Sequence, residues 1–249
     1  MPSQQGLAFR TAWPGGPPSE TIGALVSAVN KAMSAVRYTK ALAFGRLRGY
    51  QVADTPHFDP ESLEYFQSRV VSGRLYMEYG SGGSTVFAAR AGARVISVET
   101  DRHYLQSVSK QVAATAPDTH TDLIHADIGL TREWGRPVLT RPTAHRVAAW
   151  ERYLEAPWAS SELADRQPDV VLVDGRFRVA AALTCLKHLG ADSRSEILFD
   201  DYVDRPHYRA VENLMPVAKT VGRMAIFKPV SIAPGDLSRA IDEFKADWR

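Results

Sequence analysis

The sequence comprises 249 residues, of which 45% are apolar and 23% charged, and 30 basic against 28 acidic side chains give a net charge of +2. This length and composition are typical of one large α/β domain or two small globular ones. The near balance of charge gives no electrostatic reason to expect a nucleic-acid partner, and the single cysteine, Cys185, excludes an internal disulfide bond.

The N-terminal part of the chain predicts an arm followed by helices. Residues 1–18 are rich in proline, glycine and polar side chains, and we expect them to form a flexible arm. They do not resemble a signal peptide, and no run in the chain is long and apolar enough to span a membrane, so we expect a cytoplasmic protein with no membrane partner. Apolar residues then recur at helical spacing over 21–36, within an N-terminal extension of residues 19–58. This helix either packs on its own domain or forms the face of a homodimer.

The next segments predict alternating helices and strands in a single domain that spans residues 19–249. A helix begins after the N-cap Asp59 and ends near Gly73. Strands are predicted over 74–79, 94–99, 122–127, 168–174, 196–201 and 222–229, and helices over 84–93, 101–116, 176–190, 205–218 and 234–248. Strands separated by helices imply right-handed crossovers, so we predict an α/β fold with a Rossmann-like, doubly wound, mostly parallel sheet.

The stretch 129–167 interrupts this alternation. It holds Trp134, Trp150 and Trp158 together with several prolines and many charges. Because it is too long for an ordinary connection, we interpret it as an insertion at one edge of the sheet, with a helix over 142–155. The insertion either shapes a ligand pocket or only covers the sheet.

Carboxylates follow five successive predicted strands. They are Glu78, Glu99, Asp127, Asp174 and the pair Asp200–Asp201. An acid in an apolar strand costs free energy unless it reaches water or a partner. Ligands of doubly wound sheets bind outside the carboxyl ends of the strands, so the acids together predict a site at that edge, although each alone is as readily a helix N-cap.

The glycine-rich loop after the first strand limits the class of ligand. In EYGSGGST (78–85), Thr85 stands where a dinucleotide fingerprint has its third glycine, and the lysine of a phosphate-binding P-loop is absent. The negative charge of Glu78 would repel a pyrophosphate, whereas it would attract a ligand that carries an ammonium group. Glu99, 17 residues beyond Gly82, suits two ribose hydroxyls. A nicotinamide dehydrogenase is therefore the less favoured alternative.

These motifs resemble the first three cofactor motifs of class I S-adenosylmethionine-dependent methyltransferases, over roughly residues 60–230. The resemblance implies a sheet of about seven strands that ends in an antiparallel hairpin. It places Gly80 and Gly82 against the methionine part of the cofactor, with Glu78 near its amino group. It also implies a complete cofactor set of Glu78, Gly80, Ser81, Gly82, Ser84, Glu99 at the ribose, Thr100, Asp127 and Ile128 at the adenine, and Asp174.

The segment after the fourth strand separates the subclasses of this family. Base-amino methyltransferases carry Asn/Asp-Pro-Pro-aromatic there, whereas this chain has Asp174-Gly175-Arg176-Phe177. Nucleic-acid methylation is therefore disfavoured, and we expect a small-molecule or saccharide acceptor, methylated at oxygen. A catalytically inert cofactor-binding protein of the same fold is the main alternative.

The segment 198–214 resembles the Asp-Asp-Tyr segment of metal-dependent sugar O-methyltransferases. That resemblance implies Mg²⁺ held by Asp174, Asp200 and Asp201, and oxygen ligands suit this ion. However, Arg176 stands where the group has a further acid, and a guanidinium there would repel a cation and suit an anionic substrate instead. The sequence therefore leaves Mg²⁺ as an option that it does not favour.

The sequence leaves the catalytic group open. Methyl transfer is an in-line displacement that depends mainly on positioning, so no single side chain is obligatory. Asp174, Arg176 and His207 are the candidates, and His103 and His145 are further titratable groups, for which a structural role is the plainer interpretation. Cys185 lies among apolar helix residues and is expected to be a core thiol.

Overall fold

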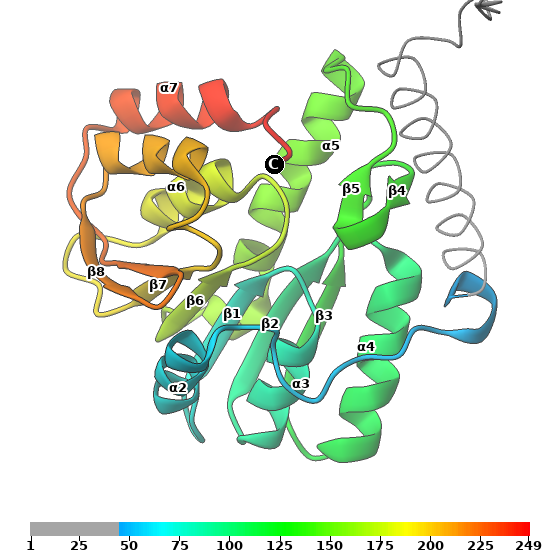
Figure 1. The fold of residues 1–249 in the computed structure, drawn as a ribbon. Helices are drawn as coiled ribbons and strands as arrows, with labels where there is room; N and C mark the ends of the chain where they lie inside the picture. The colour runs from blue at the N-terminus through cyan, green and yellow to red at the C-terminus, as the bar shows by residue number, and fades with distance from the viewer. Residues whose placement is uncertain (1–44) are drawn as a thin grey trace, which may run out of the picture. The chain divides into compact units, whose positions relative to one another are not determined.

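The computed structural model of the protein describes residues 45–249 (Figure 1). The predicted arm (1–18) and the predicted amphipathic helix (21–36), with its homodimer face, lie outside the described residues. Among residues 45–249, no helix is both long and apolar enough to cross a membrane.

A seven-stranded sheet forms the centre of the described part. Its strands are β1 (Leu75–Tyr79), β2 (Arg94–Glu99), β3 (Thr121–His125), β6 (Val170–Val173), β7 (Glu196–Phe199), β8 (Val217–Val221) and β9 (Met224–Phe227). They lie in the order β3-β2-β1-β6-β7-β9-β8, and every neighbouring pair is parallel except β7–β9 and β8–β9. The predicted Rossmann-like sheet and its terminal antiparallel hairpin are confirmed (Figure 1).

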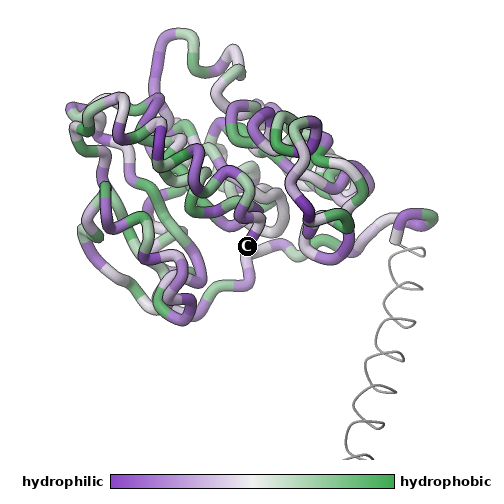
Figure 2. Tube along the Cα trace, turned by 90° about the horizontal axis from the view of Figure 1, so that it is seen from above, coloured by the Kyte–Doolittle hydropathy of each residue, from purple (hydrophilic) through white to green (hydrophobic). Residues whose placement is uncertain are grey.

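Helices cover both faces of this sheet. They are α2 (Pro60–Arg69), α3 (Gly83–Arg90), α4 (Arg102–Thr115), α5 (Ala144–Glu155), α6 (Arg178–His188) and α7 (Pro234–Phe244). Successive strand residues point to opposite faces, so Tyr76 packs with α2, α3 and α4, whereas Met77 packs with α5, α6 and α7. The central strands β1 and β6 are buried along their whole length, as expected for a sheet covered on both sides. Hydrophilic and hydrophobic residues alternate along the surrounding helices (Figure 2).

The predicted helix over 205–218 is wrong. Residues Pro206–Asn213 form a 3-10 helix, η4, and Val217–Val221 form the edge strand β8. Pro216 cannot continue a helix because it lacks the backbone N–H. The strand signal was hidden because no side chain of β8 is fully buried, so its sequence shows no apolar alternation.

The insertion contains the predicted helix, observed as α5, and a hairpin that the sequence did not reveal. The hairpin consists of β4 (Thr131–Arg132) and β5 (Arg136–Pro137), joined by the 3-10 turn η1 (Glu133–Gly135). Two further 3-10 turns, η2 (Ala156–Ala159) and η3 (Ser161–Leu163), connect α5 towards β6. The hairpin lies against the end of β2, since a Cβ at Gly135 would come within 2.2 Å of Thr100 Oγ1.

Asp59 joins the start of α2 to the terminal hairpin of the sheet. Its Oδ1 accepts a hydrogen bond from the Ser62 backbone (3.1 Å), and its Oδ2 accepts one from the Arg223 backbone (3.1 Å). Burial alone would raise the pKa of Asp59, but these hydrogen bonds and that of the Ser62 hydroxyl lower it to about 2. The ionised carboxylate is therefore the form that the fold stabilises.

We expect Asp59→Ala to lower the free energy of unfolding by about 1–2 kcal/mol, because it removes the N-cap of α2. Glu64→Ala, at an exposed position of the same helix, should change it by less than about 0.5 kcal/mol. Urea unfolding measures both. Because the folded pKa lies below the unfolded value, the contribution is complete above about pH 4 and is lost as the pH falls towards 2. A difference between wild type and variant that stays constant over this range would contradict the assignment.

Candidate active site at the carboxyl edge of the sheet

The loop after β1 is shaped by a close approach to the loop after β6. Gly80 has a φ of +98°, which favours glycine. A Cβ at this position would lie 2.7 Å from Gly175 Cα, so a side chain would push the two loops apart. Thr85, the residue that departs from the dinucleotide pattern, accepts a hydrogen bond from Gly82 N (2.8 Å) and so closes the turn into α3.

Glu78 lies beneath this loop and is completely buried. Its four acceptor positions are filled by hydroxyls from β1, β2 and α3. The donors are Tyr76 (2.6 Å) and Ser84 (2.5 Å) to Oε2, and Ser97 (2.7 Å) and Thr85 to Oε1. Burial raises the pKa of Glu78, and the four hydroxyls oppose that shift. The carboxylate therefore acts as the anchor of the loop, and its predicted nearness to a cofactor amino group stays a prediction.

Glu99 ties the ends of β1 and β2 together and is 8% exposed. Its Oε1 accepts hydrogen bonds from the backbone N–H groups of Thr100 (2.6 Å) and Asp101 (2.9 Å), and its Oε2 accepts one from Ser81 N (3.2 Å). Burial raises its pKa, whereas these backbone donors lower it. Oε2 has one donor against the three of Oε1, which also accepts from the Thr100 hydroxyl, and so retains capacity for a ligand hydroxyl.

Asp127 and Ile128, at the end of β3, open onto a cavity of about 300 Å³ between this strand end and α5. The cavity is lined by Asp127, Ile128, Gly129, Leu130, Leu139, His145, Arg146, Ala149 and Arg152. Asp127 is exposed, and one of its oxygens accepts a hydrogen bond from Gly129 N (2.8 Å). The cavity thus combines apolar residues with one accessible carboxylate and three basic side chains. Its apolar residues suit an aromatic ring, and the carboxylate suits an amino group on that ring.

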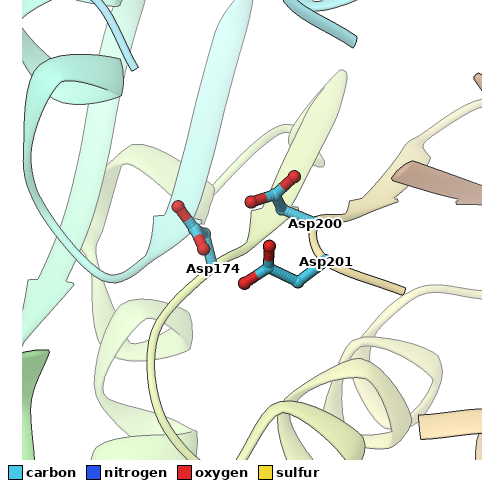
Figure 3. Close-up of side chains that lie close together, drawn as sticks. All are labelled: Asp174, Asp200 and Asp201. Carbon is cyan, nitrogen blue, oxygen red and sulfur yellow. The ribbon is translucent and has the colours of Figure 1, made fainter. Parts of the chain in front are cut away.

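Asp174, Asp200 and Asp201 meet at the ends of β6 and β7, each with a carboxylate oxygen within 4.8 Å of the others (Figure 3). Each is paired with an arginine. Arg178 Nη2 contacts Asp174 (2.7 Å), Arg205 Nη2 contacts Asp201 (2.7 Å), and Arg223 binds both oxygens of Asp200 (3.0 and 2.9 Å). Further contacts of 3.3 Å join Asp201 to Arg178 and to Arg223.

This arrangement does not fit Mg²⁺. Of the six carboxylate oxygens of this cluster, all but Asp174 Oδ2 contact an arginine among the described residues. Mg²⁺ needs several free oxygen ligands. Three guanidiniums would also repel a dication at this position. The cluster of acids that the sequence associated with a metal is therefore neutralised by three cations of the chain itself.

The proton affinity of Asp174 is raised by its position in this cluster. Its side chain keeps 31% of its surface exposed. Burial of the carboxylate and the negative charges of Asp200 and Asp201 nevertheless raise its pKa to about 7, against the opposing effect of Arg178. Asp174 can therefore exchange a proton near neutral pH.

The remaining candidates occupy different places. Arg176 is buried beside Asp174, and its backbone N–H donates to the Tyr153 hydroxyl (3.2 Å). His207 is exposed on η4, and partial burial and nearby arginines lower its pKa. His145 lines the cavity at Asp127, whereas His103 lies exposed in the first turn of α4. Cys185 is fully buried in the core, as predicted.

The sequence did not reveal that the acids pair with arginines, nor that Tyr104 and Tyr153 lie at this edge. Arg178 and Arg205 lie four positions after Asp174 and Asp201, a spacing that could have indicated the pairing. The pairing of Arg223 with Asp200 follows only from the antiparallel contact of β7 and β9. Tyr104 lies near the loop, and burial with nearby acids raises its pKa to about 12.

Comparison with known structures finds similar proteins, and the first of them supports membership of a family. A methyltransferase-like protein from Silicibacter pomeroyi is 34% identical, with a TM-score of 0.67, over 80% of this chain and 100% of its own. A methyltransferase from Geobacter sulfurreducens is 13% identical (TM-score 0.43; 85% and 98% coverage). A methyltransferase from Thiobacillus denitrificans, solved with S-adenosyl-L-homocysteine, is 15% identical (TM-score 0.36; 63% and 54% coverage). No protein-family model and no curated protein matches the sequence.

We expect Glu78→Ala to lower the free energy of unfolding by about 3–5 kcal/mol, because four buried hydroxyls would lose their shared acceptor. Asp127→Ala removes an exposed acid at the same edge and should change it by less than about 0.5 kcal/mol. Equilibrium urea unfolding of the two variants makes the comparison. Equal stabilities would show that Glu78 does not anchor the loop.

Proposed function

Because the chain belongs to the class I S-adenosylmethionine-dependent methyltransferase superfamily, we propose that it transfers a methyl group from this cofactor to an oxygen of a small-molecule or saccharide acceptor. The observation that carries the proposal is the edge formed by the ends of β1, β2 and β3. Three features follow one another along this edge in the order of the strands. They are the loop anchored by Glu78 after β1, the acid Glu99 at the end of β2, which suits a ribose, and the cavity at Asp127 after β3.

The residues of this edge fit S-adenosylmethionine from end to end. The free capacity of Glu99 Oε2 suits a ribose hydroxyl, and Asp127 can accept a hydrogen bond from an adenine amino group beside the apolar Ile128. The loop from Gly80 to Gly82 would hold the methionine part. When bound, the cofactor supplies a methyl group on a positively charged sulfur, and the acids of the edge favour that charge.

Asp174 is our candidate for the base that accepts the proton of the acceptor hydroxyl. Arg178 binds its Oδ1, and Oδ2 forms no hydrogen bond or ion pair within residues 45–249. With a pKa of about 7, the carboxylate can both accept and release a proton near neutral pH. Arg178 also keeps the carboxylate in one orientation, which favours a short and repeatable proton transfer.

The site operates without a divalent metal in this proposal. The three acids are already compensated by Arg178, Arg205 and Arg223, so no uncompensated charge remains to attract Mg²⁺. The chain would therefore differ from the metal-dependent sugar O-methyltransferases that its Asp-Asp-Tyr segment resembles. Activation of the acceptor would fall to the protein itself, through Asp174.

We expect the protein to transfer labelled methyl groups from S-adenosylmethionine to components of a bacterial metabolite extract, with the same rate in EDTA as without it. Asp174→Asn should slow transfer by about a hundredfold, since an amide cannot take the proton. Scintillation counting of the separated products measures both effects. Cofactor binding without any transfer would identify an inert binding protein. Loss of transfer in EDTA would show that the reaction depends on a divalent metal.

A further inference from the structure

The backbone at Arg176, at the carboxyl edge of the sheet, is held in place by its neighbours. It follows β6, and its backbone N–H donates to the Tyr153 hydroxyl of α5 (3.2 Å). The next residue, Phe177, has a φ of +55°, a left-handed conformation that costs a non-glycine residue about 1 kcal/mol or more. Phe177 is fully buried and packs against Trp150 and Tyr153. The surrounding packing therefore imposes this backbone conformation at the edge, directly beside Arg176.

The guanidinium of Arg176 lacks an acidic partner within residues 45–249. The residue is 7% exposed, its Nε is buried without a hydrogen-bond acceptor, and no acid of this part of the chain forms an ion pair with it. Its neighbour Arg178 instead contacts two acids. Burying a lone cation costs free energy. Burial and the positive charge of Arg178 accordingly lower the pKa of Arg176.

The insertion supplies a second arginine that has no acidic partner in the part of the chain that the structure describes. Arg136, in β5, also has a buried Nε without an acceptor, and its charge contributes to lowering the pKa of Arg176. Arg136 follows Gly135, which lies against Thr100 at the end of β2, so both arginines belong to segments at the carboxyl edge. An anion bound by both arginines would offset the repulsion between their charges and give each an acceptor.

We propose that Arg176, with Arg136, binds an anionic group, a carboxylate or phosphate, of the methyl acceptor. The identification of the ligand as an acceptor rests on the proposed methyltransferase function. The cofactor also carries a carboxylate, but the loop at Gly80 and Gly82 is its predicted cradle. Arg136 belongs to the insertion, and one of the two roles that the sequence allows for the insertion is to shape a ligand pocket. The acceptor is therefore an acidic or phosphorylated small molecule rather than a neutral sugar.

The first test measures the affinity of the wild-type protein and of Arg176→Gln for inorganic phosphate by calorimetry, with S-adenosylhomocysteine present and absent. We expect the substitution to weaken phosphate binding at least about tenfold, the effect of losing a charge-assisted hydrogen bond. Arg194→Gln, an exposed arginine in the loop before β7 at the opposite edge of the sheet, is the matched control and should bind like wild type. Equal affinities of wild type and Arg176→Gln, or no phosphate binding by wild type, would overturn the proposal.

Thermal unfolding of the ligand-free protein separates a binding role from a structural one. If Arg176 is kept for a ligand, Arg176→Gln and Arg176→Met should raise the unfolding midpoint by about 2–4 °C, because an unpaired buried charge is removed. A lower midpoint in both variants would mean that the guanidinium stabilises the fold, and would overturn the proposal.

A third arm identifies the source of the anion. S-adenosylhomocysteine carries the amino-acid carboxylate, whereas 5′-methylthioadenosine lacks it. We expect Arg176→Gln to bind both as wild type does. Selective weakening of S-adenosylhomocysteine would assign Arg176 to the cofactor and overturn the acceptor assignment. Failure of wild type to bind either nucleoside would reject the methyltransferase function, while the phosphate titration would still decide whether Arg176 binds an anion.

Discussion

Four hydroxyl groups converge on the Glu78 carboxylate, and the geometry of the whole carboxyl edge depends on that contact. They come from β1, β2 and the first turn of α3, so one buried acid holds two strands and a helix start in register. Thr85 also accepts the Gly82 N–H and thereby closes the loop. A third glycine, as in dinucleotide-binding loops, could supply neither bond. Thr85, the residue that departs from the dinucleotide pattern, therefore stabilises the conformation of this loop.

Charge is distributed unequally along the same edge. At the ends of β6 and β7, Asp174, Asp200 and Asp201 are matched by three arginines, which produces a rigid and nearly neutral cluster. Arg176, by contrast, is buried and has no acidic partner within residues 45–249. A fold tolerates such a defect where a ligand supplies the missing charge, at a cost to the stability of the empty protein. The charge of the acceptor is therefore inferred from Arg176 and not from the three acids, whose charges the arginines already balance.

The sequence predicted the parallel sheet because each central strand is buried on both faces and reads as an apolar run, as Val170–Val173 does. It also located the acids of the edge, since the alternation of strands and helices places Glu99 and Asp174 at strand ends. It did not reveal β8, whose exposed side chains carry no alternation, nor the β4–β5 hairpin within the insertion. The pairing of Arg223 with Asp200 needed the antiparallel register of β7 and β9, which no local pattern contains.

The central claim is that the ends of β1, β2 and β3 bind S-adenosylmethionine, and calorimetric titration with S-adenosylhomocysteine tests it most directly. Wild type should bind this nucleoside and not NAD. Asp127→Asn should weaken binding by about tenfold, because one exposed acceptor of the cavity is lost. Asp118→Asn, an exposed acid in the turn before β3 at the other edge of the sheet, should leave binding unchanged. Equal affinity in both variants, or tighter binding of NAD than of S-adenosylhomocysteine, would contradict the account.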